Sequence, residues 1–174
     1  MDSEQISKIL MSNPKTRRVF KGCFPSDKIP NPSQLQYPAA LIINLDTHQF
    51  EGSHWVAIYV YGQKLEAIYF DSLALPINSN IEKSFLINFP RTFTNKKGYQ
   101  SIFAKTCGQY SICFIYFLSS GYTFNEFLNY LEKYPNLYDY FVKSFVNKML
   151  TYFSKIYLKI SVETMFKFNY SFQK

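Results

Sequence analysis

Cys107 is the residue in this sequence best placed for covalent chemistry. It lies in the stretch Thr106–Tyr110, and an almost wholly apolar run follows it to about Ser119, which predicts a buried helix. A thiol at a helix start lies near the positive end of the helix dipole and beside free backbone N–H groups. Both effects favour the thiolate, which is the nucleophilic form of cysteine. We therefore treat Cys107 as the candidate nucleophile.

A histidine and a carboxylate flank a predicted β-hairpin. Residues 55–61 and 64–70 are rich in Val, Ile, Tyr and Phe, and Gly62-Gln63 between them suits a two-residue turn. In that register His54 faces Asp71 directly, within hydrogen-bonding reach. We predict that His54 is the base that ionises the thiol and later protonates a leaving amine, and that Asp71 orients it.

Gln100 precedes Cys107 by seven positions and offers a side-chain amide. With the backbone N–H of Cys107 it would form an oxyanion hole, in which one donor is typically worth about 3–4 kcal/mol in the transition state. A single Cys, His or Asp in such positions is more often structural. The hypothesis of thiol-dependent acyl transfer therefore rests on the complete set of four residues.

The remaining histidine and cysteines are not assigned a catalytic role. His48 lies in a polar loop outside the hairpin register and is predicted to be solvated. Cys113 follows Cys107 by six residues, about 240° round a helix, and is predicted to pack in the core. Cys23 is predicted to lie in a loop, without an assigned role. The sequence has no metal-ligand spacing and no phosphate-binding glycine loop, so we expect no metal and no required cofactor.

The predicted elements form an α+β fold, a single domain over 1–174 with a central mixed sheet packed against the helix of Cys107. Both faces of the hairpin are apolar, so its strands should be covered on both sides. We predict helices over 2–12, 81–89, from 123 after a capping box, and 137–157; further strands over 39–45, 99–103 and, in the tail, 158–174; and irregular chain over 22–38.

Composition limits the class of protein. Hydrophobic residues make up 47% of 174 residues, with 18 Phe and 15 Tyr, which excludes a largely disordered chain. Three cysteines do not suggest a disulfide scaffold and favour a reducing compartment. The first residues do not resemble a signal peptide, and no apolar run is long enough to predict a membrane span. We expect a monomer.

The net charge of +7 and the pI near 9.2 favour polyanionic partners, nucleic acid first. A merely soluble positive surface explains the same charge equally well. The basic residues from which we predict a DNA-binding surface are Lys15, Arg17, Arg18, Lys21, Arg91, Lys96 and Lys97.

Over roughly residues 1–120 the sequence resembles the adenovirus maturation protease family, which includes enzymes of virophages and of large self-synthesising DNA transposons; the wider clan includes SUMO-specific proteases. Gly52–Ala57 resembles the family's Gly-x-His-Trp strand start. Tyr69–Leu73 resembles its segment with the acidic residue, Gln100 with Cys107-Gly108 resembles its glutamine and nucleophile motif, and Phe20–Lys28 resembles the region after its first helix.

The resemblance implies a cysteine endopeptidase that cleaves viral precursor (capsid) proteins during particle maturation, often after small or glycine-containing sites. It implies Cys107 as nucleophile, His54 as base, Asp71 as orienting group and Gln100 as oxyanion donor, in an enzyme located in the virion and the infected cell. In the adenovirus enzyme DNA and a disulfide-linked peptide stimulate cleavage. DNA is therefore a possible activator, whereas the stretch where the peptide's cysteine partner should fall, before Gln100, has none.

Two alternatives remain open from the sequence. An isopeptidase acting on ubiquitin-like modifiers would use the same four residues with a surface for a folded modifier. A non-catalytic DNA-binding virion protein would use the basic residues alone.

Overall fold

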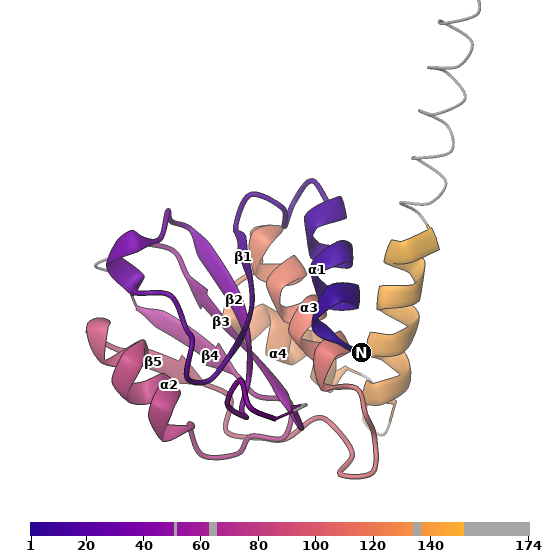
Figure 1. The fold of residues 1–174 in the computed structure, drawn as a ribbon. Helices are drawn as coiled ribbons and strands as arrows, with labels where there is room; N and C mark the ends of the chain where they lie inside the picture. Colours follow the sequence, from indigo (N-terminus) through magenta and orange to yellow (C-terminus); the bar gives the residue numbers. More distant parts are fainter. Residues whose placement is uncertain (51, 63–65, 134–136, 152–174) are drawn as a thin grey trace, which may run out of the picture.

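A five-stranded mixed sheet forms the centre of the molecule (Figure 1). The computed structural model describes residues 1–50, 52–62, 66–133 and 137–151. The strand order is β1-β2-β3-β4-β5, with β1 parallel to β2, β4 parallel to β5, and the pairs between them antiparallel. The strands are β1 (Phe20–Pro25), β2 (Ala39–Asn44), β3 (Trp55–Val60), β4 (Ala67–Phe70) and β5 (Thr92–Thr94). The predicted α+β class with a central mixed sheet is confirmed.

The helices begin where local capping signals are strongest. Asp2 and Gln5 close a capping box at the start of α1 (Ser3–Ser12), and Thr123 and Glu126 close another at the start of α4 (Phe124–Glu132). The other helical elements are η1 (Pro32–Gln34), α2 (Ser79–Ser84), η2 (Leu86–Asn88), α3 (Cys107–Ser119) and a helix over 138–151. The predicted helices at 2–12, after Thr123 and at Cys107 are confirmed.

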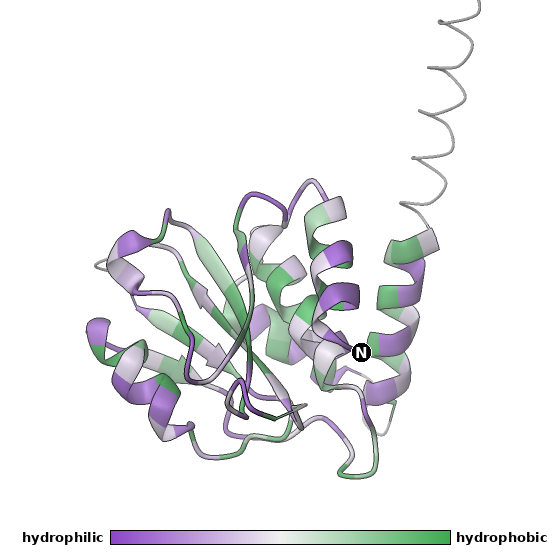
Figure 2. Cartoon of the chain, in the orientation of Figure 1, coloured by the Kyte–Doolittle hydropathy of each residue, from purple (hydrophilic) through white to green (hydrophobic). Residues whose placement is uncertain are grey.

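Two hydrophobic cores cover the two faces of the sheet. One joins the sheet to α1, α3, α4 and the helix over 138–151, and the other joins its opposite face to α2 and η2. Ala57 and Tyr59 point into the first core, whereas Val56, Ile58 and Val60 point into the second. Figure 2 shows the matching hydrophobic colouring of the strands and of α3. The prediction that the hairpin is covered on both sides is confirmed.

The predicted hairpin register is wrong by two residues. In the structure Ala57 pairs with Phe70 and Val60 with Ala67, because six residues, 61–66, connect β3 to β4 instead of two. The predicted strand residues 64 and 65 lie outside the described part of the chain. An even slip leaves every side chain on its predicted face, since strand side chains alternate with a period of two. The contact deduced from the register therefore survives, although the register does not.

Three further expectations are wrong. Part of the segment predicted as irregular forms β1, which places Cys23 in a strand instead of a loop. The predicted strand over 99–103 is absent, and β5 at Thr92–Thr94 is the strand that pairs with β4. The helix predicted over 81–89 is divided into α2 and η2. Short strands depend on pairing with distant chain, which local composition does not report.

The last predicted elements are only partly described. Residues 138–151 are helical, in agreement with the helix predicted over 137–157. Residues 152–157 of that predicted helix and the predicted strand over 158–174 lie outside the described residues. Over the described ranges, no helix combines the length and apolarity needed to cross a membrane. In the same part of the chain no cluster of three or more His, Cys, Asp or Glu side chains could hold a metal ion.

Candidate active site

His54 and Asp71 form a buried pair at one end of the central strands. His54 directly precedes β3 and Asp71 directly follows β4, so antiparallel pairing brings both to the same sheet end. The Nε2 atom of His54 lies 2.6 Å from Oδ1 of Asp71, and the two residues are 7% and 0% exposed. The carboxylate of Asp71 also accepts the backbone N–H groups of Leu73 at 2.8 Å and Leu75 at 3.2 Å. These donors satisfy a carboxylate that has no access to water.

Cys107 is the first residue of α3, and the His54 imidazole lies close enough to its thiol to lower the pKa of that thiol. Burial raises the pKa of the Cys107 thiol, but the hydrogen bond and charge of His54 and the backbone N–H groups of Trp55 and Gly108 outweigh it, so that the pKa lies below its ordinary value. Every one of these partners favours the thiolate.

The imidazole of His54 bridges the thiol and the carboxylate. Because Nε2 faces Asp71, the nitrogen available to Cys107 is Nδ1. Burial lowers the pKa of His54, but the hydrogen bonds and charges of Asp71 and Cys107 raise it to about 9. The structure thus brings three of the four predicted residues together, with the His54 imidazole between the Cys107 thiol and the Asp71 carboxyl group.

Gln100, the fourth predicted residue, lies at the start of the loop that leads to Cys107. Its side-chain Nε2 donates to the carbonyl of Ala104 at 2.6 Å, and its Oε1 accepts the hydroxyl of Ser72 at 2.8 Å. One of the two N–H groups on Nε2 therefore stays free of these bonds. The amide is fixed, with its oxygen held toward Ser72 and its nitrogen toward the loop that ends at Cys107.

Two polar residues that the sequence analysis did not single out hold this arrangement. Asn95, which is 4% exposed, donates from Nδ2 to the carbonyl of Asp71 at 2.6 Å and accepts the N–H of Asp71 at 3.0 Å. Besides its bond to Gln100, Ser72 accepts the backbone N–H of Gln100 at its carbonyl, at 2.9 Å. An asparagine in a basic loop carries no sequence signal, whereas Ser72 is the immediate neighbour of Asp71.

Two glycines beside the site have close neighbours at the position of a Cβ. Gly52 has φ +92°, and a Cβ there would lie 1.7 Å from Nδ2 of Asn44. Gly108 follows the nucleophile, where a Cβ would lie 3.3 Å from side-chain atoms of Met1 and Ile6. Gly52 thus admits no side chain two residues before His54, and Gly108 lets α1 approach the start of α3.

Comparisons with known proteins add a partial structural likeness. No protein-family model matches the sequence, and no curated protein matches it either. Among solved structures, the ASFV pS273R protease is 19% identical, with a TM-score of 0.43, over 72% of this chain and 59% of that protein. Its selenomethionine form is 21% identical, with a TM-score of 0.33, over 51% and 37%. The chain thus spans less than two thirds of that protease, and the chemistry of the site is argued from its own residues.

The remaining histidine and cysteines lie apart from this triad. His48 is half-exposed and pairs through Nδ1 with Asp27. Cys113 is fully buried in the core, as predicted, and burial raises the pKa of its thiol. Burial also raises the pKa of Cys23 to about 11, against the lowering effect of a hydrogen bond from Ser7.

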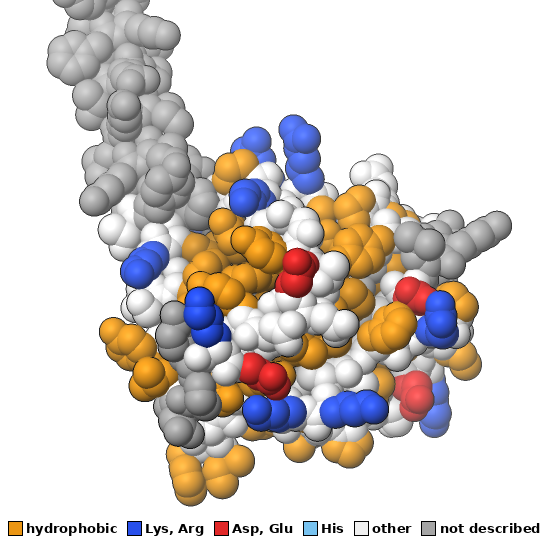
Figure 3. Space-filling view, turned by 180° about the vertical axis from the view of Figure 1, so that it is seen from behind, with side chains coloured by type: hydrophobic (Ala, Val, Ile, Leu, Met, Phe, Trp, Pro, Cys, Tyr) orange, Lys and Arg blue, Asp and Glu red, His pale blue; other side chains and the backbone are white. Residues whose placement is uncertain are grey.

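The predicted DNA-binding residues fall into two groups at opposite edges of the sheet. Lys15, Arg17 and Arg18 lie between α1 and β1 and Lys21 lies in β1, whereas Arg91, Lys96 and Lys97 flank β5. In the second group Arg91 pairs with Glu66, and Lys97 lies 3.6 Å from Glu132. On the face seen in Figure 3, Lys and Arg side chains are spread around the edge and do not gather in one patch.

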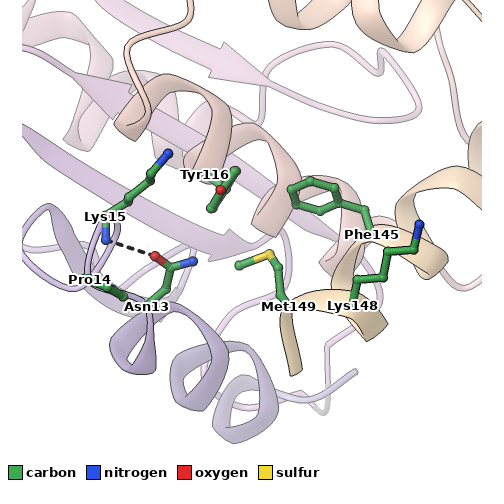
Figure 4. A pocket seen from close by; sticks show the side chains of 7 residues that line it. All are labelled: Asn13, Pro14, Lys15, Tyr116, Phe145, Lys148 and Met149. Atoms are coloured by element: carbon green, nitrogen blue, oxygen red, sulfur yellow. Dashed lines mark hydrogen bonds between the residues drawn. The ribbon is translucent and has the colours of Figure 1, made fainter. Parts of the chain in front are cut away.

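Lys15 lies at a pocket remote from the triad. Its ammonium is 5.3 Å from the centre of the Tyr116 ring, near the far end of α3. The pocket, of ≈ 490 Å³, combines apolar walls with a second ammonium; its other lining residues are Asn13, Pro14, Phe145, Lys148 and Met149 (Figure 4).

Proposed function

We propose that the protein is a cysteine endopeptidase that uses Cys107, His54, Asp71 and Gln100. The observation that carries the proposal is the position of His54, which hydrogen-bonds to the buried Asp71 and on its other side interacts with Cys107, so that the pKa of the thiol is lowered. A structural role for a buried cysteine requires neither an imidazole partner nor a carboxylate behind it.

In the first half of the reaction the Cys107 thiolate attacks the carbonyl carbon of a peptide bond. The carbonyl oxygen becomes an oxyanion, for which the free N–H of the Gln100 amide and the backbone N–H of Cys107 are the proposed donors. The His54 imidazolium then gives its proton to the amine as the C–N bond breaks, leaving a thioester on Cys107 and a neutral imidazole.

In the second half a water molecule attacks the thioester. Neutral His54 takes a proton from that water, the C–S bond breaks, and the acid product leaves with the thiolate and imidazolium restored. The buried Asp71 carboxylate keeps the imidazole in one orientation and favours its protonated form through both steps.

The proposed substrates are viral precursor proteins, cleaved during particle maturation. This substrate class is supported by the resemblance of three segments to the adenovirus maturation protease family, namely Gly52–Ala57, Tyr69–Leu73 and Gln100–Gly108. Duplex DNA is the proposed activator, supported by the net charge of +7. The proposed substrates and the proposed DNA activator would meet in the interior of a virion, where precursor proteins and genome are packed together.

The test compares wild type with Cys107→Ala and His54→Ala on capsid precursor protein, with and without duplex DNA. We expect cleavage by wild type only, labelling of Cys107 by a thiol-reactive peptide warhead, and faster cleavage with DNA. Cleavage by Cys107→Ala would refute the proposal. Preferential turnover of ubiquitin-like C-terminal amide reporters would indicate an isopeptidase instead of an endopeptidase. Salt-sensitive DNA binding without any labelling of Cys107 would indicate a non-catalytic DNA-binding protein.

A further inference from the structure

The loop between Gln100 and Cys107 is held at both ends by one carboxylate from a distant helix. Asp139 accepts the backbone N–H of Ser101 at Oδ2, at 3.0 Å, and the hydroxyl of Thr106 at Oδ1. Ser101 directly follows Gln100, and Thr106 directly precedes Cys107. The two oxygens of Asp139 therefore connect the neighbours of the two proposed oxyanion donors.

Apart from Asp139, the Gln100 amide also holds the loop, since it donates to the carbonyl of Ala104 at 2.6 Å. At its tip Ile102 and Phe103 are 81% and 90% exposed, so burial of these large apolar side chains does not fix it. Within the loop the backbone N–H of Ala104 donates to the carbonyl of Ser101. Charge-assisted hydrogen bonds such as those to Asp139 are roughly twice as strong as neutral ones, which makes that carboxylate the principal anchor.

The hydrogen bond to Asp139 also replaces the usual capping role of the Thr106 hydroxyl. Thr106 occupies the N-cap position of α3, where a threonine hydroxyl normally accepts a backbone N–H of the first helical turn. Its side chain makes no such bond, and it is fully buried. The first N–H groups of α3 are thereby not capped by Thr106, so the Gly108 N–H can act on the thiol, whose pKa it lowers, and others are available to the proposed oxyanion.

The helix that carries Asp139 is itself fixed next to Gln100. The ring of Tyr138 packs edge-on against Tyr99, the residue before Gln100, with 5.6 Å between centres. Asp139 lies in the first turn of the helix over 138–151, where the dipole favours a negative charge. The carboxylate is thus held beside the loop before any substrate binds.

We propose that Asp139 is a positioning residue, which holds both ends of the loop over 101–106 and so sets the spacing of the Gln100 amide and the Cys107 backbone N–H. The inference rests on the proposed function. It gives the region after about residue 120, beyond the part of the chain that resembles the family, a part in the same reaction.

Two reagents separate positioning of the oxyanion donors from general damage. A p-nitrophenyl ester of a glycine peptide acylates Cys107 through an oxyanion, whereas iodoacetamide alkylates the thiolate at a saturated carbon without one. In Asp139→Ala we expect the kcat of ester hydrolysis to fall roughly tenfold, with KM within about twofold, since small misplacement of donors is costly. The alkylation rate should stay within about twofold of wild type.

Three variants complete the design. Asp139→Asn keeps one acceptor and should restore part of the kcat, and Thr106→Val should lower the kcat as Asp139→Ala does. Tyr140→Ala, on the same helical turn with a side chain that is 72% exposed, is the matched control and should behave as wild type. Cys107→Ala gives the background for both reagents.

Hydrogen exchange of the amides over 101–106 tests the anchor without any turnover. We expect exchange to accelerate at least roughly tenfold in Asp139→Ala and to stay unchanged in Tyr140→Ala. Unchanged exchange, an unchanged kcat, or a parallel fall in alkylation would each overturn the proposal for Asp139. A wild type that reacts with iodoacetamide but hydrolyses neither ester nor peptide would overturn the proposed function, while hydrogen exchange would still decide the anchor.

Discussion

His54 and Asp71 are hydrogen-bonded at 2.6 Å although they are not opposite each other in the sheet. Continuing the β3–β4 register beyond Ala57 and Phe70 places Val56 opposite Asp71, so His54 is a diagonal neighbour beyond the end of the ladder. Asp71 is held in place by the N–H groups of Leu73 and Leu75, which donate to its carboxylate, and by the side chain of Asn95, which hydrogen-bonds to its backbone.

The first prediction concerns the charge on Asp71. Asp71→Asn keeps an acceptor for His54 but removes the charge that raises the pKa of the imidazole. We expect peptide hydrolysis at pH 7 to fall at least roughly tenfold, with a smaller loss of stability than in Asp71→Ala. Asp71→Ala should also lower the free energy of unfolding by about 2–4 kcal/mol, because the buried donors lose their acceptor. Urea unfolding and steady-state kinetics check both, and equal stability of the two variants would contradict the role of the Leu73 and Leu75 bonds.

The second prediction compares the three thiols. The pKa is lowered for Cys107, raised to about 11 for Cys23 and raised for Cys113. At pH 6 iodoacetamide should therefore modify Cys107 first, as mapped by peptide mass spectrometry. In His54→Gln the rate at Cys107 should fall at least roughly tenfold at this pH, since each unit of pKa changes the thiolate fraction tenfold. Faster modification of Cys23 would contradict the lowered pKa of the Cys107 thiol.

The third prediction concerns stability against pH in Cys107→Ala, where His54 keeps Asp71 as its partner. The raised pKa of His54 contributes stability that is fully present below its unfolded value of 6.5 and is lost as pH rises through the folded value. The free energy of unfolding should therefore decrease above pH 6.5, by up to about 1.4 kcal/mol per pH unit.

In wild type the lowered pKa of Cys107 acts with the opposite sign, because the stability it contributes is lost as pH falls through the folded value. The dependence between pH 6.5 and about 9 should therefore be shallower than in Cys107→Ala. The double variant His54→Gln/Cys107→Ala is the control and should lack this decrease. A decrease equally steep in wild type would argue against a coupled pair.

The fourth prediction uses two glycines that share φ +92° but differ in space. A Cβ at Gly52 meets the Asn44 side chain, whereas a Cβ at Gly121 meets nothing within 4 Å. Gly121→Ala should cost only the backbone strain, about 1–2 kcal/mol. Gly52→Ala should cost clearly more, and it should slow alkylation of Cys107 by displacing His54. Thermal unfolding of both variants measures the difference, and equal losses would show that the Asn44 contact is unimportant.

Local signals predicted the helices well because capping is local. The capping boxes at Asp2 and Thr123 each involve residues three positions apart, and both helices begin where these signals lie. The start of α3 at Cys107 follows from its apolar run. The strands were harder, since β1 and β5 exist through parallel pairing with residues far along the chain, and the length of the β3–β4 connection shifted the register.

The site shows the same division between local and distant information. His54 and Asp71 could be connected from the hairpin because an even slip preserved their common face. The contacts of Asp139 with Ser101 and Thr106 span 38 and 33 residues, and nothing near Asp139 in the sequence signals them. Asn95 likewise reaches Asp71 across 24 residues. Residues that orient the site are thus the part that sequence patterns alone left out.

The positions of the three central residues at the ends of β3 and β4 and the start of α3 also bear on folding kinetics. Cys107 acquires its lowered pKa only when α3 has docked on β3, a contact between segments about fifty residues apart. Before docking, its thiol titrates as an ordinary cysteine with a pKa of about 8.5. A brief pulse of alkylating agent at low pH during refolding therefore modifies Cys107 only in chains that have completed this long-range docking. The extent of modification at each refolding time then measures the fraction of chains in which α3 has docked on β3.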